Sequence, residues 1–253
     1  MTEQAENNNP IAEITRINGR LPNQMRPVSL DVGYARYAEG SCLVKFGDTQ
    51  VLCVATIENK VPDWLRGKKS GWITAEYGML PRATHSRTRR EARHGQTGRS
   101  QEIQRLVGRA LRAAVDCHAL GERQIIVDCD VIQADGGTRT AAITGGFVAV
   151  YQAVKSLEST GLIPNNTIIT RNVAALSCVI SGGNILVDPD YAEDSSADVD
   201  ANFVVSDDGH LIEIQASAEK NPFSPDQLHS MVKITSEAIQ SLTLKQKEVL
   251  QSL

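Results

Sequence analysis

The sequence predicts an α+β protein in which strands and helices share one core. Short runs rich in Val and Ile, bounded by Gly and Asp, are typical of β-strands. Longer stretches repeat apolar residues at intervals of three and four, which indicates helices with a buried face. The chain has 253 residues, of which 41% are hydrophobic and only 4% aromatic. We therefore expect a single domain over residues 16–253, with a core made mostly of aliphatic side chains.

The first third of the chain is predicted to consist mainly of strands. They are expected at residues 28–35, 41–46, 50–57 and 72–80. Gly47-Asp48-Thr49, between the second and third of these, is a hairpin signal. Residues 1–15 are polar and lack the apolar stretch of a secretory signal, so we expect a disordered tail there.

An arginine-rich segment follows the fourth predicted strand. Residues 82–112 carry nine arginines and no lysine, against two acids, although the whole chain has a net charge of −4. Residues 82–99 have almost no apolar side chain and are expected to stay outside the core. They form either a solvated loop or an arm that contacts the phosphates and bases of a nucleic acid. A basic patch on an acidic chain fits a polyanion bound at one place.

The clearest helix of the sequence comes after this segment. Ser100 is its expected N-cap and Gly121 its expected end. One stripe at helical spacing is predicted to be buried, and it consists of Ile103, Leu106, Val107, Ala110, Leu111, Ala114 and Val115. A second face carries Arg105, Arg109 and Arg112, which are expected to pair with carboxylates. Arg99, beside the Gly98 turn, is well placed for an anion.

A strand, a glycine turn and a second helix then follow in order. The strand is expected at residues 124–132 and the helix at residues 140–157. Glycines in the turn Asp135-Gly136-Gly137 permit positive φ, and amides at a helix N-terminus favour an anion. Arg139 adds a guanidinium suited to phosphate. The sequence therefore predicts an anion pocket made by Gly137, Thr138 and Arg139. The alternative is an ordinary turn in which Thr138 or Thr140 caps the helix.

Two groups of carboxylates have more than one interpretation. Asp128 and Asp130 point to one face of their strand, where they either hold a metal ion or, as we prefer, neutralise the helix arginines. Residues 188–200 contain six acids and no base. This segment is expected to be a loop that either binds a hard cation such as Mg²⁺ or stays solvated.

The rest of the chain adds strands and a closing helix. Strands are expected at residues 173–180, 184–187, 201–205 and 211–217, and an amphipathic helix at residues 225–250. The five cysteines are scattered and form no Cys-x-x-Cys pair. We interpret them as reduced, mostly buried thiols, which together with the absence of a long apolar run favours a cytoplasmic protein without a membrane partner.

Four ordered stretches make the chain resemble the ribonuclease PH family of phosphate-dependent tRNA nucleotidyltransferases. They are residues 71–84, residues 98–99 with 102–109, residues 128–140, and residues 193–197 with Asp200. The resemblance implies a two-layer α/β sandwich with mixed sheets and βαβ units. It also implies a homohexamer, built as a trimer of dimers, that trims the 3′ end of tRNA precursors and other structured RNA. Inorganic phosphate is the co-substrate, and nucleoside diphosphates are released.

The resemblance also assigns roles to individual residues. Phosphate-binding positions of the family match Arg99, Gly137, Thr138 and Arg139. Its acidic pair, which places Mg²⁺ (or Mn²⁺) or supplies acid catalysis, matches Asp194 and Asp200. The arm that holds tRNA matches Arg82, Arg87 and Arg90. The segment between Glu91 and Gly98 looks one residue shorter than in some relatives, so Arg93 and His94 receive no role.

Two rival functions follow from other classes of protein. A catalytically silent ring subunit that only binds RNA is expected to lack the Gly-Thr-Arg turn or the paired aspartates, and both are present here. A nucleoside phosphorylase also binds phosphate, but it has little use for an arginine-rich arm.

Overall fold

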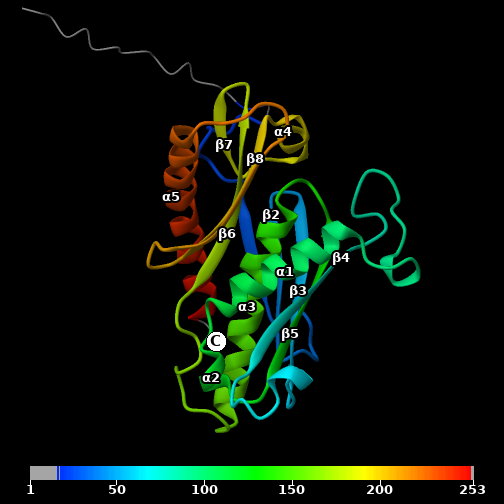
Figure 1. Ribbon diagram of the computed structural model, residues 1–253, viewed down its shortest axis with the longest axis vertical. Coiled ribbons are helices and arrows are strands. Elements are labelled where there is room, and N and C mark those ends of the chain that lie inside the picture. The colour runs from blue at the N-terminus through cyan, green and yellow to red at the C-terminus, as the bar shows by residue number, and fades with distance from the viewer. Residues whose placement is uncertain (1–15, 17, 252–253) are drawn as a thin grey trace, which may run out of the picture.

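The computed structural model describes residue 16 and residues 18–251, which form two β-sheets and their covering helices (Figure 1). The strands are β1 (Val28–Val32), β2 (Gly40–Phe46), β3 (Thr49–Glu58), β4 (Trp72–Met79), β5 (Gln124–Gln133), β6 (Val173–Ser181), β7 (Asn184–Val187), β8 (Val199–Ser206) and β9 (Leu211–Ala218). The α-helices are α1 (Gly98–Arg112), α2 (Cys117–Leu120), α3 (Thr138–Ser159), α4 (Tyr191–Ser196) and α5 (Pro225–Leu250). The short 3₁₀ helices are η1 (Asp63–Leu65) and η2 (Glu91–Arg93). The expected tail at residues 1–15 lies outside the described residues.

The first sheet has five strands in the order β1-β2-β3-β5-β4. Neighbouring strands in this sheet run antiparallel, except for β4 and β5. These two run parallel because α1 and α2 form the crossover between them. This crossover is the βαβ unit that brings the start of α1 to the same end of the sheet as the end of β5. The predicted hairpin is confirmed, since β2 and β3 pair across Gly47-Asp48.

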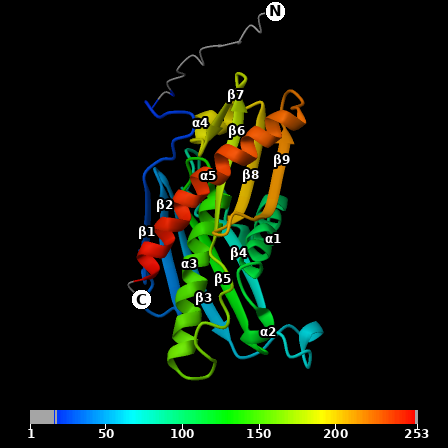
Figure 2. The ribbon, with the colours of Figure 1, turned by 90° about the vertical axis from the view of Figure 1, so that its left-hand side faces the viewer.

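The second sheet has four strands in the order β7-β6-β8-β9, and all its neighbours are antiparallel. Figure 2 shows α3 lying along the first sheet and α5 along the second. Helix α5 begins as its sequence predicts, because Ser224 caps it through a reciprocal capping box with Gln227 and Pro225 occupies the first turn. The predicted mixed α/β architecture is confirmed, although only the first of the two sheets is mixed.

Helix α3 lies at the centre and joins the two sheets into one core. It contacts β2 and β3 on one side and β6 on the other. Small residues permit this close packing: a Cβ on Gly145 would lie 2.5 Å from a methyl carbon of Val44. The core is continuous from the first sheet to the second, with Phe46, Phe147 and Phe203 fully buried. No helix among residues 16 and 18–251 has the length and apolar character needed to cross a bilayer.

Three expectations about local structure are wrong. The N-cap of α1 is Thr97, whose hydroxyl accepts from the Ser100 amide, so the helix starts three residues earlier than expected. The predicted single helix up to Gly121 ends at Arg112, and the separate α2 is capped by Asp116. The acidic segment, expected to be a loop, contains α4 because Asp190 provides a capping box. All five cysteines are free, and four of them are buried, as predicted.

Candidate active site

The glycine turn between β5 and α3 is the first part of the candidate site. Gly136 and Gly137 have φ of +74° and +67°, in the left-handed region that glycine adopts without strain. A Cβ on Gly136 would also lie 2.4 Å from the Pro189 carbonyl oxygen. Gly137 caps α3 without any side-chain hydrogen bond, which leaves the first amides of the helix available to an anion. The predicted strand, turn and helix are confirmed.

Neither threonine of this turn is its N-cap, so that part of the alternative interpretation is wrong. Thr138 is already the first residue of α3. The Thr140 hydroxyl donates back to the Gly137 carbonyl at 3.0 Å and therefore satisfies a backbone acceptor.

Arg26 holds the other side of this turn, and sequence reasoning missed it. Its guanidinium donates to the carbonyl oxygens of Asp135 and Gly136. The Thr49 hydroxyl donates to the Gly136 oxygen as well, at 2.6 Å. The same hydroxyl accepts from the Asp135 amide at 3.0 Å. With the carbonyls of Asp135 and Gly136 and the Asp135 amide bound on this side, the amides of Gly137 and of the first turn of α3 are left for an anion on the opposite side. The only signal in the sequence is a lone arginine between Met25 and the first predicted strand, which is a weak indication of a buried ion pair.

Arg26 also ties the turn to the segment that leads into α4. Its Nη2 donates to Asp188 Oδ1 at 2.6 Å, and its Nε donates to Asp188 Oδ2 at 3.0 Å. Both side chains are almost fully buried. Burial alone would lower the pKa of Arg26, but the hydrogen bond and charge of Asp188 outweigh it and raise that pKa. The ion pair therefore fixes the distance between the turn and the start of α4.

Helix α4 is held in place by two further buried arginines. Arg16 Nε donates to Glu193 Oε1 at 2.6 Å, and Arg20 Nη2 donates to Glu193 Oε2 at 3.3 Å. Glu193 also completes the capping box of α4 by accepting from the Asp190 amide. Because Asp194 is the next residue, these contacts fix where its carboxylate lies.

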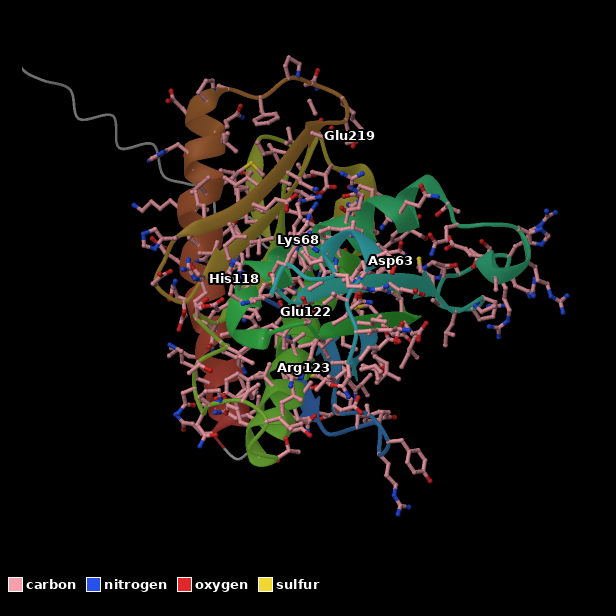
Figure 3. All side chains as sticks on the ribbon, turned by 60° about the horizontal axis from the view of Figure 1, so that its bottom comes forward. Asp63, Lys68, His118, Glu122, Arg123 and Glu219 are labelled. Atoms are coloured by element: carbon pink, nitrogen blue, oxygen red, sulfur yellow. The ribbon has the colours of Figure 1, made fainter. Side chains whose placement is uncertain are left out.

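Asp194 and Asp200 form an acidic pair at the end of this arrangement. Burial and the charge of Asp194 raise the pKa of Asp200 to about 6, against the opposing effect of Arg139. Burial likewise raises the pKa of Asp194, although Arg99 and Arg139 oppose the shift. Glu219, which follows β9 and is labelled in Figure 3, adds negative charge to both. Two desolvated carboxylates that repel each other are typical of a catalytic or metal-binding pair.

Arg139 connects the anion turn to this acidic pair. Its Nη2 donates to Glu102 Oε2 on α1 at 3.1 Å, and its Nη1 lies 3.7 Å from Asp200 Oδ2 on β8. Its Nε is buried and has no hydrogen-bond partner among the described residues. The guanidinium therefore stands between a carboxylate of α1 and one of the acidic pair, with donor capacity to spare.

The predicted residues meet around a pocket of about 330 Å³. Arg99 from α1, Gly137 and Thr138 from the turn, and Asp194 from α4 all line it. Asp200 and Arg139 are not among its lining residues, but the ion pair between them and the field of Asp194 on Asp200 place both beside it. An anion held by the turn and Arg99 would therefore lie next to the acidic pair.

The donor set of this pair fits a hydrated divalent cation. Among the described residues, no group of three His, Cys, Asp or Glu side chains has the arrangement of a complete protein-made metal site. Mg²⁺ usually keeps several waters and takes one or two carboxylates together with substrate phosphates. Asp194 and Asp200 supply two carboxylates whose mutual repulsion a cation would relieve.

The arginine-rich segment between β4 and α1 projects from the body as an arm (Figure 1), and most of its residues are exposed, although Ala83 is buried. Arg82, Arg87 and Arg90 are exposed and do not line the pocket. The start of the same arm does reach it, since Thr84, His85 and Ser86 form part of its wall. The other end is anchored by Glu91, which accepts from Ser100 Oγ at 2.6 Å. The arm therefore begins at the pocket and continues into solvent.

Asp128 and Asp130 lie apart from this site, and the preferred interpretation of them is wrong. They line a separate, acidic pocket on β4 and β5 with Glu76 and Glu91. Within residues 16 and 18–251, neither forms an ion pair with the helix arginines. Arg109 pairs with Glu213, so the expectation that it pairs with a carboxylate is confirmed. Arg112 instead donates to the Ile73 carbonyl and stacks on Trp72.

Comparison with known families decides the family of this chain. A model of the 3′ exoribonuclease family (RNase PH), domain 1, matches residues 24–156, and the model of domain 2 matches residues 172–238. The chain belongs to the RNase PH family. The domain 1 match contains Arg99 and the glycine turn, and the domain 2 match contains Asp194 and Asp200. In this RNase PH-family protein, the two matched regions thus meet at the candidate site.

Solved structures support the same fold. Rice (Oryza sativa) Rrp46 is 20% identical, with a TM-score of 0.75 over 93% of this chain and 100% of that one. An archaeal exosome core chain is 22% identical, with a TM-score of 0.74 over 92% and 91%. The Archaeoglobus fulgidus exosome with RNA bound to the active site is 23% identical, with a TM-score of 0.75 over 91% and 92%. At these sequence identities, the similarity shows that the chain shares the fold of these structures.

Proposed function

We propose that this protein is a phosphorolytic 3′-to-5′ exoribonuclease that trims the 3′ end of tRNA precursors. Inorganic phosphate is the attacking group, and nucleoside diphosphates are released. The observation that carries the proposal is the meeting of an anion-binding turn, Arg99 and an acidic pair around one pocket. The arm projects from the body (Figure 1), and its arginines form no ion pair among the described residues. This supports an RNA substrate, because guanidinium groups bind phosphate and stack on bases.

The reaction needs no nucleophile from the protein. A phosphate oxygen forms a bond to the phosphorus of the last phosphodiester, and the bond from that phosphorus to the 3′ oxygen of the preceding nucleotide breaks. The departing 3′ oxygen takes up a proton, and the RNA is one nucleotide shorter. In this transition state negative charge spreads over the phosphoryl oxygens, so fixed donors close to them give most of the rate enhancement.

Each candidate residue has a defined part in that step. The turn amides, Thr138 and Arg99 bind the attacking phosphate, and Arg139 orients it toward the scissile group. Asp194 and Asp200 would hold Mg²⁺ or Mn²⁺, which when bound supplies positive charge to the phosphoryl oxygens. The arm residues Arg82, Arg87 and Arg90 hold the tRNA body while its 3′ end enters the pocket.

We further propose that the protein works as a homohexameric ring in the cytoplasm. The arm extends far from its own subunit (Figure 1), which suits an RNA that spans neighbouring copies. The five free cysteines suit a reducing compartment. Velocity sedimentation of the purified chain measures the assembly directly.

Identification of the released mononucleotide tests the reaction. A tRNA with a few extra 3′ nucleotides is incubated with the protein and Mg²⁺, with and without inorganic phosphate. Nucleoside diphosphates that appear only with phosphate are expected. Monophosphates released without phosphate would mean hydrolysis and would refute the proposal. Bound tRNA without trimming would favour the catalytically silent, RNA-binding ring subunit instead.

Asp200→Asn separates catalysis from binding at the acidic pair. It keeps the shape of the side chain but removes the charge that a cation or a proton transfer needs, so catalysis is expected to fall about 10²-fold or more while the Kd for tRNA stays close to that of the wild type. Filter binding and single-turnover trimming measure the two quantities. An equal loss of both would point to a structural role for Asp200.

A further inference from the structure

The hydroxyl of Tyr77 bonds directly to the anion-binding turn. Its Oη donates to Thr138 Oγ1 at 2.8 Å. Tyr77 lies on β4, where Ile73, Ala75 and Tyr77 alternate as the buried face of the strand. The ring is part of the main core, with only 3% of the residue exposed. The strand thus places one polar atom of an otherwise apolar face against the first residue of α3.

This hydrogen bond determines what the Thr138 hydroxyl is able to do. A hydroxyl has one proton and two acceptor lone pairs. One lone pair of Thr138 is occupied by Tyr77, and no acceptor for the Thr138 proton is found among residues 16 and 18–251. Thr138 is itself only 5% exposed, and it lines the pocket beside Gly137 and Arg99. The proton of this buried hydroxyl is therefore free to point at an anion in the pocket.

Tyr77 remains a donor over the working range of pH. Burial raises the pKa of Tyr77 above its ordinary value, although the hydrogen bond to Thr138 and the charges of Arg99 and Arg139 oppose the shift. Because burial outweighs these opposing effects, the phenol keeps its proton. Without the hydrogen bond from Tyr77, a threonine in the first turn of a helix is free to turn its hydroxyl toward backbone carbonyls.

We propose that Tyr77 is a positioning residue for phosphate, which fixes the Thr138 hydroxyl as a donor to the bound anion. The inference rests on the proposed function, since it assigns Tyr77 to the phosphate part of that site. Tyr77 does not touch the substrate itself. Its effect passes through one oxygen atom, and it concerns phosphate and not RNA.

Tyr77→Phe tests this role with a minimal change, because it removes the hydroxyl and keeps the ring that fills the core. The KM for phosphate is expected to rise about five- to tenfold, the range for loss of one hydrogen bond that supports a charged ligand. The kcat at saturating phosphate and the KM for tRNA are expected to stay within twofold. Tyr151→Phe is the matched control, because Tyr151 lies on α3 away from the pocket and its hydroxyl has no hydrogen bond among the described residues.

A double-mutant cycle separates positioning from a general structural effect. Thr138→Val removes the hydroxyl but keeps the branched shape, and Tyr77→Phe is expected to add less than a twofold change in that background. Thr138→Ser keeps the hydroxyl, so the full effect of Tyr77→Phe is expected to return. If Tyr77→Phe raises the KM for phosphate by the same factor in the Thr138→Val background as in the wild type, the inference is overturned. A rise in the KM for tRNA as large as the rise in the KM for phosphate would also overturn it.

Calorimetry with inorganic phosphate alone, without RNA, makes the test independent of the reaction. The Kd for phosphate is expected to rise five- to tenfold in Tyr77→Phe and to stay unchanged in Tyr151→Phe. A wild type that binds phosphate without releasing diphosphates would refute the proposed function but leave the inference intact. Equal phosphate affinity of the wild type and Tyr77→Phe would refute the inference even if phosphorolysis is observed.

Discussion

Two groups of arginines in this protein have opposite surroundings. In the arm, Arg82, Arg87, Arg89, Arg90 and Arg93 are exposed, and within residues 16 and 18–251 their guanidinium groups form no ion pair. In the segment before β1, Arg16, Arg20 and Arg26 are at most 7% exposed. All three contact Asp188 or Glu193. The same residue type therefore presents positive charge to solvent in one region and neutralises buried carboxylates in the other.

This difference shows that arginine density in the sequence does not locate the most constrained arginines. The arm stands out because its arginines are adjacent, yet adjacency makes them repel each other and stay solvated. The buried arginines are spaced among Gly, Leu, Asn and Pro, and their partners lie more than 160 residues away. A free guanidinium is available to RNA, whereas a paired one builds the site.

The largest effect is expected at the buried group. Arg26→Ala removes the bidentate partner of the buried Asp188, which keeps only the more distant Arg20 at 3.7 Å, and it removes the guanidinium donor to the turn's carbonyls. The free energy of unfolding is therefore expected to fall by about 3–5 kcal/mol. Urea denaturation followed by circular dichroism measures it. Adding Asp188→Asn is expected to restore part of the stability, because asparagine tolerates the φ of +51° at this position and carries no charge. A single variant as stable as the wild type would contradict the assigned role of Arg26.

Substitution of Arg99 is expected to leave stability unchanged, as in the arm, but to lower activity strongly, as at the site. It is exposed and forms no ion pair among the described residues, so Arg99→Ala leaves the free energy of unfolding nearly unchanged. The kcat/KM for phosphate is expected to fall about 10²- to 10³-fold, as for loss of one preorganised donor to a developing anion. Initial rates over a phosphate series give this value. Wild-type phosphate dependence would remove Arg99 from the site.

The arm itself should show a smaller effect, confined to RNA. The double variant Arg87→Ala/Arg90→Ala is expected to weaken tRNA binding about tenfold and to reduce the slope of log K against log salt by about 1.5 to 2. The KM for phosphate should not change, because neither side chain lines the pocket. Fluorescence anisotropy over a salt series measures both the affinity and the slope. An unaltered slope would mean that these arginines do not contact phosphates.

The smallest effect among the arginine substitutions is expected at Arg93. It is the last residue of η2 and is exposed. Arg93→Ala is expected to change tRNA binding and stability by less than about 0.5 kcal/mol each. A loss as large as that of the Arg87/Arg90 double variant would show that binding depends on the total charge of the arm and not on particular residues.

The elements that the sequence predicted well are those with local signals. Alternating and helical periodicity located the nine strands and three long helices of the described residues, and Gly136-Gly137 located the turn of the candidate site. The errors arise where a distant residue decides the structure. Helix α4 exists because Asp190 and Glu193 cap it while Arg16 and Arg20 neutralise it. Asp128 and Asp130 line a pocket together with Glu76. No local sequence pattern indicates that Arg109 and Arg112 have other partners.

The buried ion pairs have a consequence for synthesis. Arg16 meets Glu193, and Arg26 meets Asp188, across 177 and 162 residues of chain. A growing polypeptide that has reached only the end of α3 already carries Arg99, Thr138 and Arg139, but it has neither the acidic pair nor the partners of its N-terminal arginines. Contacts of such long range form late, after the local elements. A nascent chain at that stage therefore holds only the anion-binding half of the candidate site, and the site is completed only after Asp200 has been added.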